Sequence, residues 1–328
     1  MSTSRPPAEI AILAYPGAQK AAIHGLTDLF AEASRIAGEA AGDSAPRLRI
    51  THWLPDDEAT SVTLDYDSLP GTPSRPAVVI VPPSLGNLPD PEIIRRLAAW
   101  LTRRHDEGGI LASVCAGAFL LAETGLLDGR PATTHWGLAE ELGSRFPAIR
   151  IEADKLIVED GDVITAAGVM AWTDLGLKLV DRLISPGVMM ATARFLLVDP
   201  PGREQRYYSN FSPRLSHGDA AILKVQHWLQ TQATQSAGLT QMAAQAGLEA
   251  RTFLRRFHRA TGLKPTEYCQ HLRVGKAREL LELTTRSIEQ IAFAVGYEDA
   301  GAFRKVFHKH VGLSPGDYRR RFGGAEAG

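Results

Sequence analysis

Apolar and polar residues follow two different patterns over the first 200 residues of the chain. Short apolar runs predict β-strands, and the longer segments between them, in which apolar residues recur every three or four positions, predict helices. Strands that alternate with helices favour an α/β domain with a mainly parallel sheet covered on both faces. The predicted strands are residues 10–14, 48–54, 77–81, 109–114, 132–134, 155–158 and 163–166, the last two forming a hairpin. The predicted helices are residues 21–37, 91–104, 118–124, 138–146 and 172–183.

From residue 219 onward the pattern is helical, and one unit of sequence occurs twice. The segment GLKPTEY at 262–268 recurs as GLSPGDY at 312–318, and a pair of phenylalanines precedes each copy. A unit used twice predicts a two-lobed helical domain, because solenoids need three or more repeats. The phenylalanine pairs are Phe253 with Phe257 and Phe303 with Phe307.

Each copy of the unit is expected to fold as a helix, a tight turn and a second helix. Gly247 and Gly296 stand where the turn needs a left-handed backbone conformation. Ser287, followed three residues later by Gln290, predicts a capping box at the start of the first helix of the second copy. Residues 265–283 are predicted to form a long helix that joins the two lobes.

The second helix of each unit is expected to present basic residues to a partner. If the paired phenylalanines face the core, the residues on the opposite side of the helix are exposed. Arginine in such a position can form two hydrogen bonds with guanine in the major groove of DNA, whereas small residues leave mainly phosphate contacts. The alternative is that these arginines are merely solvated. The exposed positions are Arg251, Leu254 and Arg255 in the first unit, and Gly301, Ala302, Arg304 and Lys305 in the second.

The formal net charge of -1 hides an uneven distribution of charged residues. Residues 1–214 carry an excess of acidic residues, and residues 215–328 carry an excess of basic ones. A basic domain with two helix-turn-helix patterns favours double-stranded DNA as its partner. No segment reaches the roughly 20 uncharged apolar residues of a membrane span, so no membrane contact is expected. The two cysteines exclude a disulfide framework and, without a signal-peptide pattern, favour a cytoplasmic location.

Residues 217–322 resemble the DNA-binding domain of the AraC/XylS transcriptional regulators. The second unit, SIEQIAFAVGYEDAGAFRKVFHKHVGLSPGDYRRRF, follows that family's signature almost residue by residue. The resemblance implies two helix-turn-helix units in one chain, each entering one of two successive major grooves on one face of the DNA. It also implies the base-contacting positions, which are Arg251, Leu254 and Arg255 in the first unit and Gly301, Ala302 and Lys305 in the second.

The predicted strand 109–114 runs directly into Cys115, which is followed by small residues and then by a helix. A thiol at the N-terminus of a helix is expected to favour the thiolate. Ala116 and Gly117 are small enough to leave open space for a ligand. This cysteine turn resembles the nucleophile elbow of the ThiJ/PfpI group in the class I glutamine amidotransferase-like superfamily, which implies a flavodoxin-like sandwich.

The segment LAETGLLDGRPATTHW at 121–136 resembles the GlxA-type regulators, which join a ThiJ/PfpI-like domain to an AraC-type domain. The similarity spans roughly residues 8–322. Members of that group are mostly activators, often of amino-acid, amine or quaternary-amine catabolism. The resemblance implies a ligand pocket at the cysteine turn, bordered by Cys115, Ala116, Gly117, His135 and Trp136, with Ser84 and Asp174 nearby.

The same turn raises the question of catalysis, because Cys115 and His135 could act as nucleophile and proton carrier. Two departures from the relatives argue against it. Ala22 stands where relatives have an acidic residue beside the cysteine, and Pro82-Pro83-Ser84 replaces their Pro-Gly-Gly. We therefore expect a binding pocket with no catalytic residue. The alternatives are an amidase-like or hydratase-like enzyme tethered to DNA, a thiol redox sensor, and a cysteine that is purely structural.

The sequence predicts a one-component transcription activator that acts as a homodimer and responds to a small metabolite. Residues 8–200 are expected to sense the effector and to dimerise, 201–216 to form a linker, and 217–322 to bind DNA. No cofactor or metal is expected, because no known metal-ligand spacing occurs. Trp136 and Trp172 could form an aromatic cage for an alkylammonium group, although core packing would also account for them.

Overall fold

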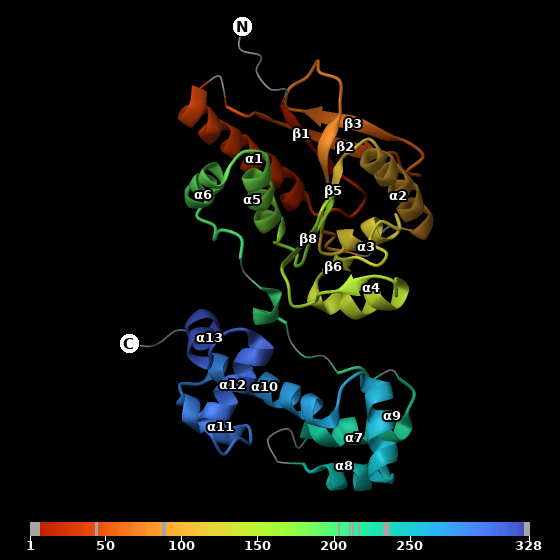
Figure 1. Cartoon of the computed structure of the whole chain (residues 1–328), viewed down its shortest axis with the longest axis vertical. Coiled ribbons are helices and arrows are strands. Elements are labelled where there is room, and N and C mark those ends of the chain that lie inside the picture. Colours follow the sequence, from red (N-terminus) through yellow and green to blue (C-terminus); the bar gives the residue numbers. More distant parts are fainter. Residues whose placement is uncertain are drawn as a thin grey trace. The chain divides into compact units, whose positions relative to one another are not determined.

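The computed structural model describes residues 7–42, 45–86, 90–202, 204–209, 211, 213–215, 217–231 and 237–324 of the 328-residue chain. It divides into two compact units, Met1–Gln205 and Arg206–Gly328, which are described separately below (Figure 1). Of the predicted linker, residues 203, 210, 212 and 216 lie outside the described part of the chain.

The first unit contains a seven-stranded sheet with the strand order β3-β2-β1-β4-β5-β9-β8. The five inner strands are parallel to one another, and the two edge strands, β3 and β8, run antiparallel to their neighbours. Two short parallel strands, β6 and β7, form a second sheet. The strands are β1 (Ala8–Leu13), β2 (Leu48–Pro55), β3 (Val62–Asp67), β4 (Pro76–Val81), β5 (Ile110–Val114), β6 (Pro131–Ala132), β7 (Arg150–Ile151), β8 (Ile157–Asp160) and β9 (Val163–Ala166).

Helices cover both faces of the large sheet and bury two apolar clusters against it (Figure 1). One face packs against α1 (Lys20–Ala41), α5 (Trp172–Leu183) and α6 (Pro186–Phe195). The other packs against α2 (Pro91–Asp106) and α3 (Gly117–Ala122), with α4 (Ala139–Arg145) beyond them. The mainly parallel α/β sandwich predicted from the sequence is therefore confirmed, although β3, β7 and α6 were not predicted.

The second unit is entirely helical within its described residues and has two small cores. The long helix α10 contributes Tyr268 to the first core and Ala277 and Leu281 to the second. This confirms the prediction of a helix that joins two lobes. The helices are α7 (Ala220–Thr231), α8 (Leu239–Ala246), α9 (Ala250–Thr261), α10 (Pro265–Leu283), α11 (Ile288–Ala294), α12 (Ala300–Val311) and α13 (Pro315–Phe322).

Across the described ranges, no helix is both long enough and apolar enough to cross a bilayer. A search of the same ranges finds no group of three or more His, Cys, Asp or Glu side chains arranged to hold a metal ion.

Candidate functional site

The first helix-turn-helix unit consists of α8 and α9. Gly247 ends α8 with a φ of 65°, the left-handed conformation that the sequence predicted. Phe253 and Phe257 of α9 are fully buried, and the Phe257 ring meets Tyr268 of α10 edge to face at 5.3 Å. One face of α9 is thus fixed against the core of the lobe.

The opposite face of α9 is exposed to solvent. Arg251, Leu254 and Arg255 are all exposed, and they share this face because they lie three and four residues apart. Leu254 leaves 40% of its surface accessible and adds an apolar contact to this face. The structure therefore places these three side chains where a duplex could contact them.

Arg256 of α9 has a different role that the sequence reasoning missed. Its guanidinium donates two hydrogen bonds, of 2.9 and 2.7 Å, to the carboxylate of Asp219, and this contact holds the pKa of Asp219 below its usual value. Asp219 also accepts a hydrogen bond from the backbone N–H of Ile222 at the start of α7. The pair therefore fixes α9 to α7.

The second unit consists of α11 and α12. The capping box at Ser287 and Gln290 is confirmed, with each side chain bonded to the other's backbone N–H. The carboxylate of Asp299 caps α12 by accepting from the N–H groups of Gly301 and Ala302 at 3.1 and 2.7 Å. Phe303 is fully buried, as predicted.

The outer face of α12 carries Ala302, Arg304 and Lys305, all of which are exposed, while Gly301 is partly covered by the capping carboxylate of Asp299. The Arg304 guanidinium pairs with Glu289 of α11 at 2.5 Å, and both side chains are about half exposed. The phosphate contact expected of Arg304 therefore competes with this pair.

The cysteine turn lies where β5 ends and α3 begins. Cys115 has a φ of 54°, a left-handed conformation that is uncommon for a residue with a side chain. Its N–H donates to the carbonyl of Ala166 in β9, and its carbonyl accepts from the hydroxyl of Thr134, both at 2.8 Å. Only 3% of Cys115 is exposed, so the turn is buried.

The predicted thiolate at this turn is wrong. Burial raises the pKa of the Cys115 thiol above its ordinary value, because a charged sulfur would lose its hydration. Backbone N–H groups of Ala116, Gly168 and His135 point at the sulfur and oppose this effect without overcoming it. The helix that follows has only six residues, which leaves a short dipole to stabilise a charge.

The expected open space beside the cysteine is also wrong at Gly117. A Cβ at that position would lie 2.6 Å from the carbonyl oxygen of Val81 and 2.8 Å from that of Pro82. Gly117 is therefore needed for the close approach of α3 to the end of β4. Ala116, at 6% exposure, is equally enclosed.

His135 and Trp136 are half-buried beside the turn, and their rings lie in tilted contact with centroids 5.1 Å apart. The Nδ1 atom of His135 accepts a hydrogen bond from the N–H of Gly137, and burial lowers the pKa of its ring. Trp172 packs in the core instead, because a Cβ on Gly25 of α1 would overlap its ring. Trp172 could be part of an aromatic cage only if its ring left this packed position.

Ser84 and Asp174 are buried but engage other partners. The Ser84 hydroxyl donates to the carbonyl of Gly17 at 3.0 Å, which ties the end of β4 to the start of α1. Asp174, in the first turn of α5, is 1% exposed and accepts from the hydroxyl of Thr173. The groups that meet the Cys115 thiol are instead the backbone N–H groups of Ala116, His135 and Gly168.

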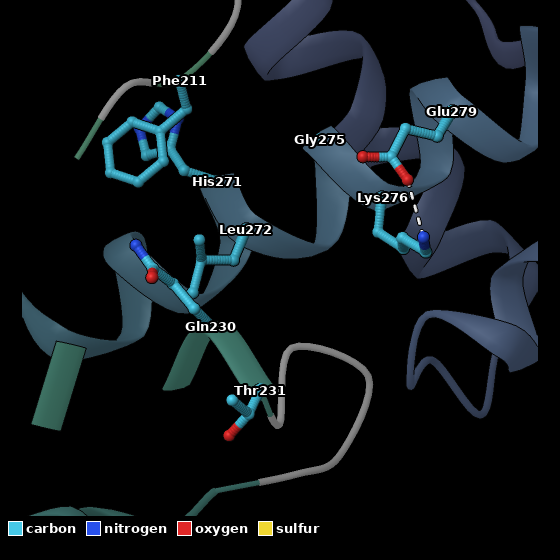
Figure 2. Close-up of a pocket in the computed structure, with 8 residues that line it drawn as sticks. All are labelled: Phe211, Gln230, Thr231, His271, Leu272, Gly275, Lys276 and Glu279. Atoms are coloured by element: carbon cyan, nitrogen blue, oxygen red, sulfur yellow. Dashed lines mark hydrogen bonds and ion pairs between the residues drawn. The ribbon is translucent and has the colours of Figure 1, made fainter. Parts of the chain in front are cut away.

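Two cavities lie away from the cysteine turn. One of about 480 Å³ is in the second unit, between the end of α7 and the outer side of α10 (Figure 2). Phe211 stacks on His271 at one side of it, with centroids 4.6 Å apart. Lys276 and Glu279 form an ion pair of 2.6 Å at the other side. A second cavity, of about 390 Å³, is lined by residues of β8 and α5 in the first unit.

Two family models match the chain, one described as a helix-turn-helix domain over residues 242–321 and one as the DJ-1/PfpI family over residues 69–182. The HTH-type transcriptional regulator GlxA of Rhizobium meliloti is 30% identical over 227 residues, which cover 67% of this chain and 68% of that protein. The chain belongs to the AraC-type transcriptional regulators that carry a DJ-1/PfpI domain. The resemblance read from the sequence is thereby confirmed.

One further relative agrees with this assignment, and a protein of known structure is also similar to the chain. The regulator CdhR of Pseudomonas aeruginosa is 27% identical over 224 residues, which cover 68% of this chain and 66% of that protein. A ThiJ/PfpI family protein from Pseudomonas syringae, of known structure, is 24% identical and covers 75% of this chain and 93% of its own, with a TM-score of 0.43. This AraC-type regulator is therefore a DNA-binding transcription regulator whose partner is double-stranded DNA.

Proposed function

We propose that this AraC-type regulator activates transcription by reading a promoter sequence with α9 and α12 and by responding to a small metabolite at the cysteine turn. The orientation of α9 is the observation that supports the proposed recognition of DNA. Buried phenylalanines fix one face, so that Arg251, Leu254 and Arg255 are exposed together on the other. Relatives of the helical unit that are named as transcriptional activators, such as RhaS of Klebsiella pneumoniae, support an activating role.

The helices α9 and α12 would contribute differently to DNA recognition. Arg251 and Arg255 have the length and the planar donors to reach guanine in a major groove. On α12 the small side chains of Gly301 and Ala302 allow the backbone to approach the duplex closely, and Lys305 would contact phosphate. Sequence specificity is therefore expected to come mainly from α9, whereas α12 adds affinity.

The experiment that tests this uses the full chain and an operator selected from random DNA by the wild-type protein. Replacing Arg251 and Arg255 together by alanine should reduce the ratio of specific to nonspecific affinity by about 30-fold or more, because each guanine contact contributes roughly 1–3 kcal/mol of discrimination. Fluorescence anisotropy at fixed salt measures both affinities.

Arg103→Ala is the matched control, because Arg103 is an exposed arginine on α2 of the first unit. It should leave the specificity ratio unchanged. If the control and the α9 double variant behaved alike, the recognition role of α9 would be refuted.

For the first unit we propose a binding site and no catalysis. Three features of the turn support this. Its thiol has a raised pKa, His135 already accepts a hydrogen bond from its own loop, and the buried Ala22 stands where a catalytic acid would be needed. A thiol redox sensor is disfavoured by the same burial and raised pKa.

Among the effector classes considered, an amino acid fits the turn best. The backbone N–H groups of Ala116, Gly168 and His135 point at the Cys115 sulfur, and a carboxylate that entered the turn would accept from these donors in place of the sulfur. Amines and quaternary amines remain within the proposed class, with the adjacent His135 and Trp136 rings as their contact surface. Ser84 and Asp174 would support the pocket from outside through their bonds to neighbouring loops.

We further propose a cytoplasmic homodimer formed through residues 8–200, with residues 201–216 as the linker and 217–322 as the DNA-binding domain. Leu54, Leu64 and Tyr66 at the β2–β3 edge are each at least 40% exposed, which suits a surface covered by a second copy. Sedimentation equilibrium of the full chain checks this, and a monomer at micromolar concentration would contradict it.

A further inference from the structure

Gln205 is the last residue of the first unit, yet its side chain is only 3% exposed. Its Nε2 donates to the carbonyl oxygen of Thr134 at 2.9 Å and to that of Ala153. Its Oε1 accepts from the backbone N–H of Trp136 at 3.0 Å. Both ends of the amide are therefore bonded to backbone, so the side chain fastens the end of the unit to the loop that carries His135 and Trp136.

The same loop is also bonded to the cysteine turn. The hydroxyl of Thr134 donates to the carbonyl of Cys115 at 2.8 Å, and the N–H of Thr133 donates to the hydroxyl of Thr165 in β9 at 2.8 Å. Thr133 and Thr134 are fully buried. Gln205 and Cys115 are thus bonded to the same short buried segment, and Thr134 contacts both.

The next residue, Arg206, begins the second unit and is fixed within it. Its carbonyl accepts from a guanidinium nitrogen of Arg278 at 2.9 Å, and Arg278 also donates to the carbonyl of Ser209. Arg278 is 5% exposed and lies on α10, the helix that contributes to both lobes of the DNA-binding domain. The peptide bond between Gln205 and Arg206 therefore joins a residue bonded to the 133–136 loop to a residue bonded to α10.

We propose that Gln205 is the positioning residue that couples the cysteine turn to α10. A ligand that displaces the 133–136 loop would break the contacts of the Gln205 amide. A buried amide without partners is costly, so the side chain would leave its site and the restraint on Arg206 would change with it. The ligand would in this way shift the population of two arrangements of the connection. This inference deepens the proposed function and rests on it.

Hydrogen exchange of the full chain, followed by mass spectrometry without any ligand, tests the coupling. Gln205→Ala should speed exchange by about tenfold in peptides covering 133–138 as well as 205–209, because both segments lose the same anchor. Thr134→Val, which removes the hydroxyl bonded to Cys115, should speed exchange at 205–207 in return, because coupling is reciprocal. Gln230→Ala, at an exposed amide on α7, is the control and should change neither segment.

A change confined to 205–209 in Gln205→Ala, or unchanged exchange at 205–207 in Thr134→Val, would overturn the coupling. Gln205→Met keeps the volume of the side chain and replaces the alanine variant if that variant does not fold. Because no ligand is used, these results are independent of the proposed function. A wild-type protein that responds to no metabolite would refute the sensor role while leaving the exchange result intact.

Discussion

At the scale of single residues, Gly117 is required by space rather than by backbone conformation. The main-chain atoms that a Cβ would meet, the carbonyl oxygens of Val81 and Pro82, belong to the end of the central strand β4 and the residue after it. Such atoms cannot yield as the end of a flexible side chain can. The close approach of α3 to β4 is what sets the position of Cys115, two residues earlier.

Gly117→Ala should therefore lower the free energy of unfolding of the first unit by about 2 kcal/mol, the usual cost of overpacking. Urea denaturation measures it. Gly38→Ala on α1 is the control, because a Cβ there meets nothing within 4 Å. It should stabilise the unit by up to about 1 kcal/mol through helix propensity. Equal effects of the two substitutions would show that the crowding at Gly117 relaxes without cost.

Cys115 shows what the sequence could and could not predict at this scale. The run of apolar residues followed by small ones predicted the strand, the turn and the helix around it. The state of the thiol depends on what covers it, and the covering groups come from residues 135 and 168, which are distant in sequence. Only the folded chain brings burial and these N–H donors together, so the raised pKa could not be predicted.

At the scale of elements, α9 is held on two sides. Buried aromatic rings fix it to α10, and the Arg256–Asp219 pair fixes it to α7. From the sequence alone, Arg256 would be grouped with the other arginines of this recognition helix as a DNA contact. Its partner stands far earlier in the chain, so only the structure separates Arg256 from its neighbours Arg251 and Arg255.

Arg256→Gln should lower the thermal midpoint of the second unit at neutral pH. The pKa of Asp219 is lowered in the folded chain, so the pair stabilises the fold above about pH 4, the ordinary range of an aspartate, and the effect is lost as the pH falls through the lowered value. The difference between variant and wild type should accordingly shrink below pH 4. Thermal scans between pH 7 and pH 2 measure it.

Glu289→Gln provides the comparison for this prediction. It breaks the Arg304 pair, whose side chains are both about half exposed and therefore screened by solvent. Its effect on the midpoint should be the smaller of the two. A pH-independent difference for Arg256→Gln would mean that the arginine acts through its packing rather than through Asp219.

Burial along an element accounts for some of the successes and failures of these predictions. The strand Val163–Ala166 is wholly buried, and it was predicted with its observed bounds, as were α5 and α10. The strand β3 is exposed along most of its length, so its sequence shows no buried face. Helix α6 begins with Pro186 and Gly187, which look like helix breakers, although Ser185 caps the helix and proline suits its first turn.

At the scale of the whole molecule, the sequence predicted two units of different character because their charge and periodicity differ. It predicted residues 201–216 as a linker between them. Within that linker the structure shows Gln205 buried in the first unit and Arg206 bonded to α10 in the second. These contacts join groups that are distant from one another in sequence, so no local sequence pattern predicts them.

The last prediction concerns what the whole chain does with a small molecule. A panel of amino acids, amines and quaternary amines should contain a compound that raises the thermal midpoint of the full chain, because a ligand stabilises the state that it binds. At a ligand concentration 100 times its Kd, the free energy of unfolding rises by about 2.7 kcal/mol. The compound should be recovered unchanged. Cys115→Ala should retain most of the shift, since the proposed donors at the turn are backbone groups. Turnover that disappears in Cys115→Ala would instead identify an enzyme tethered to DNA.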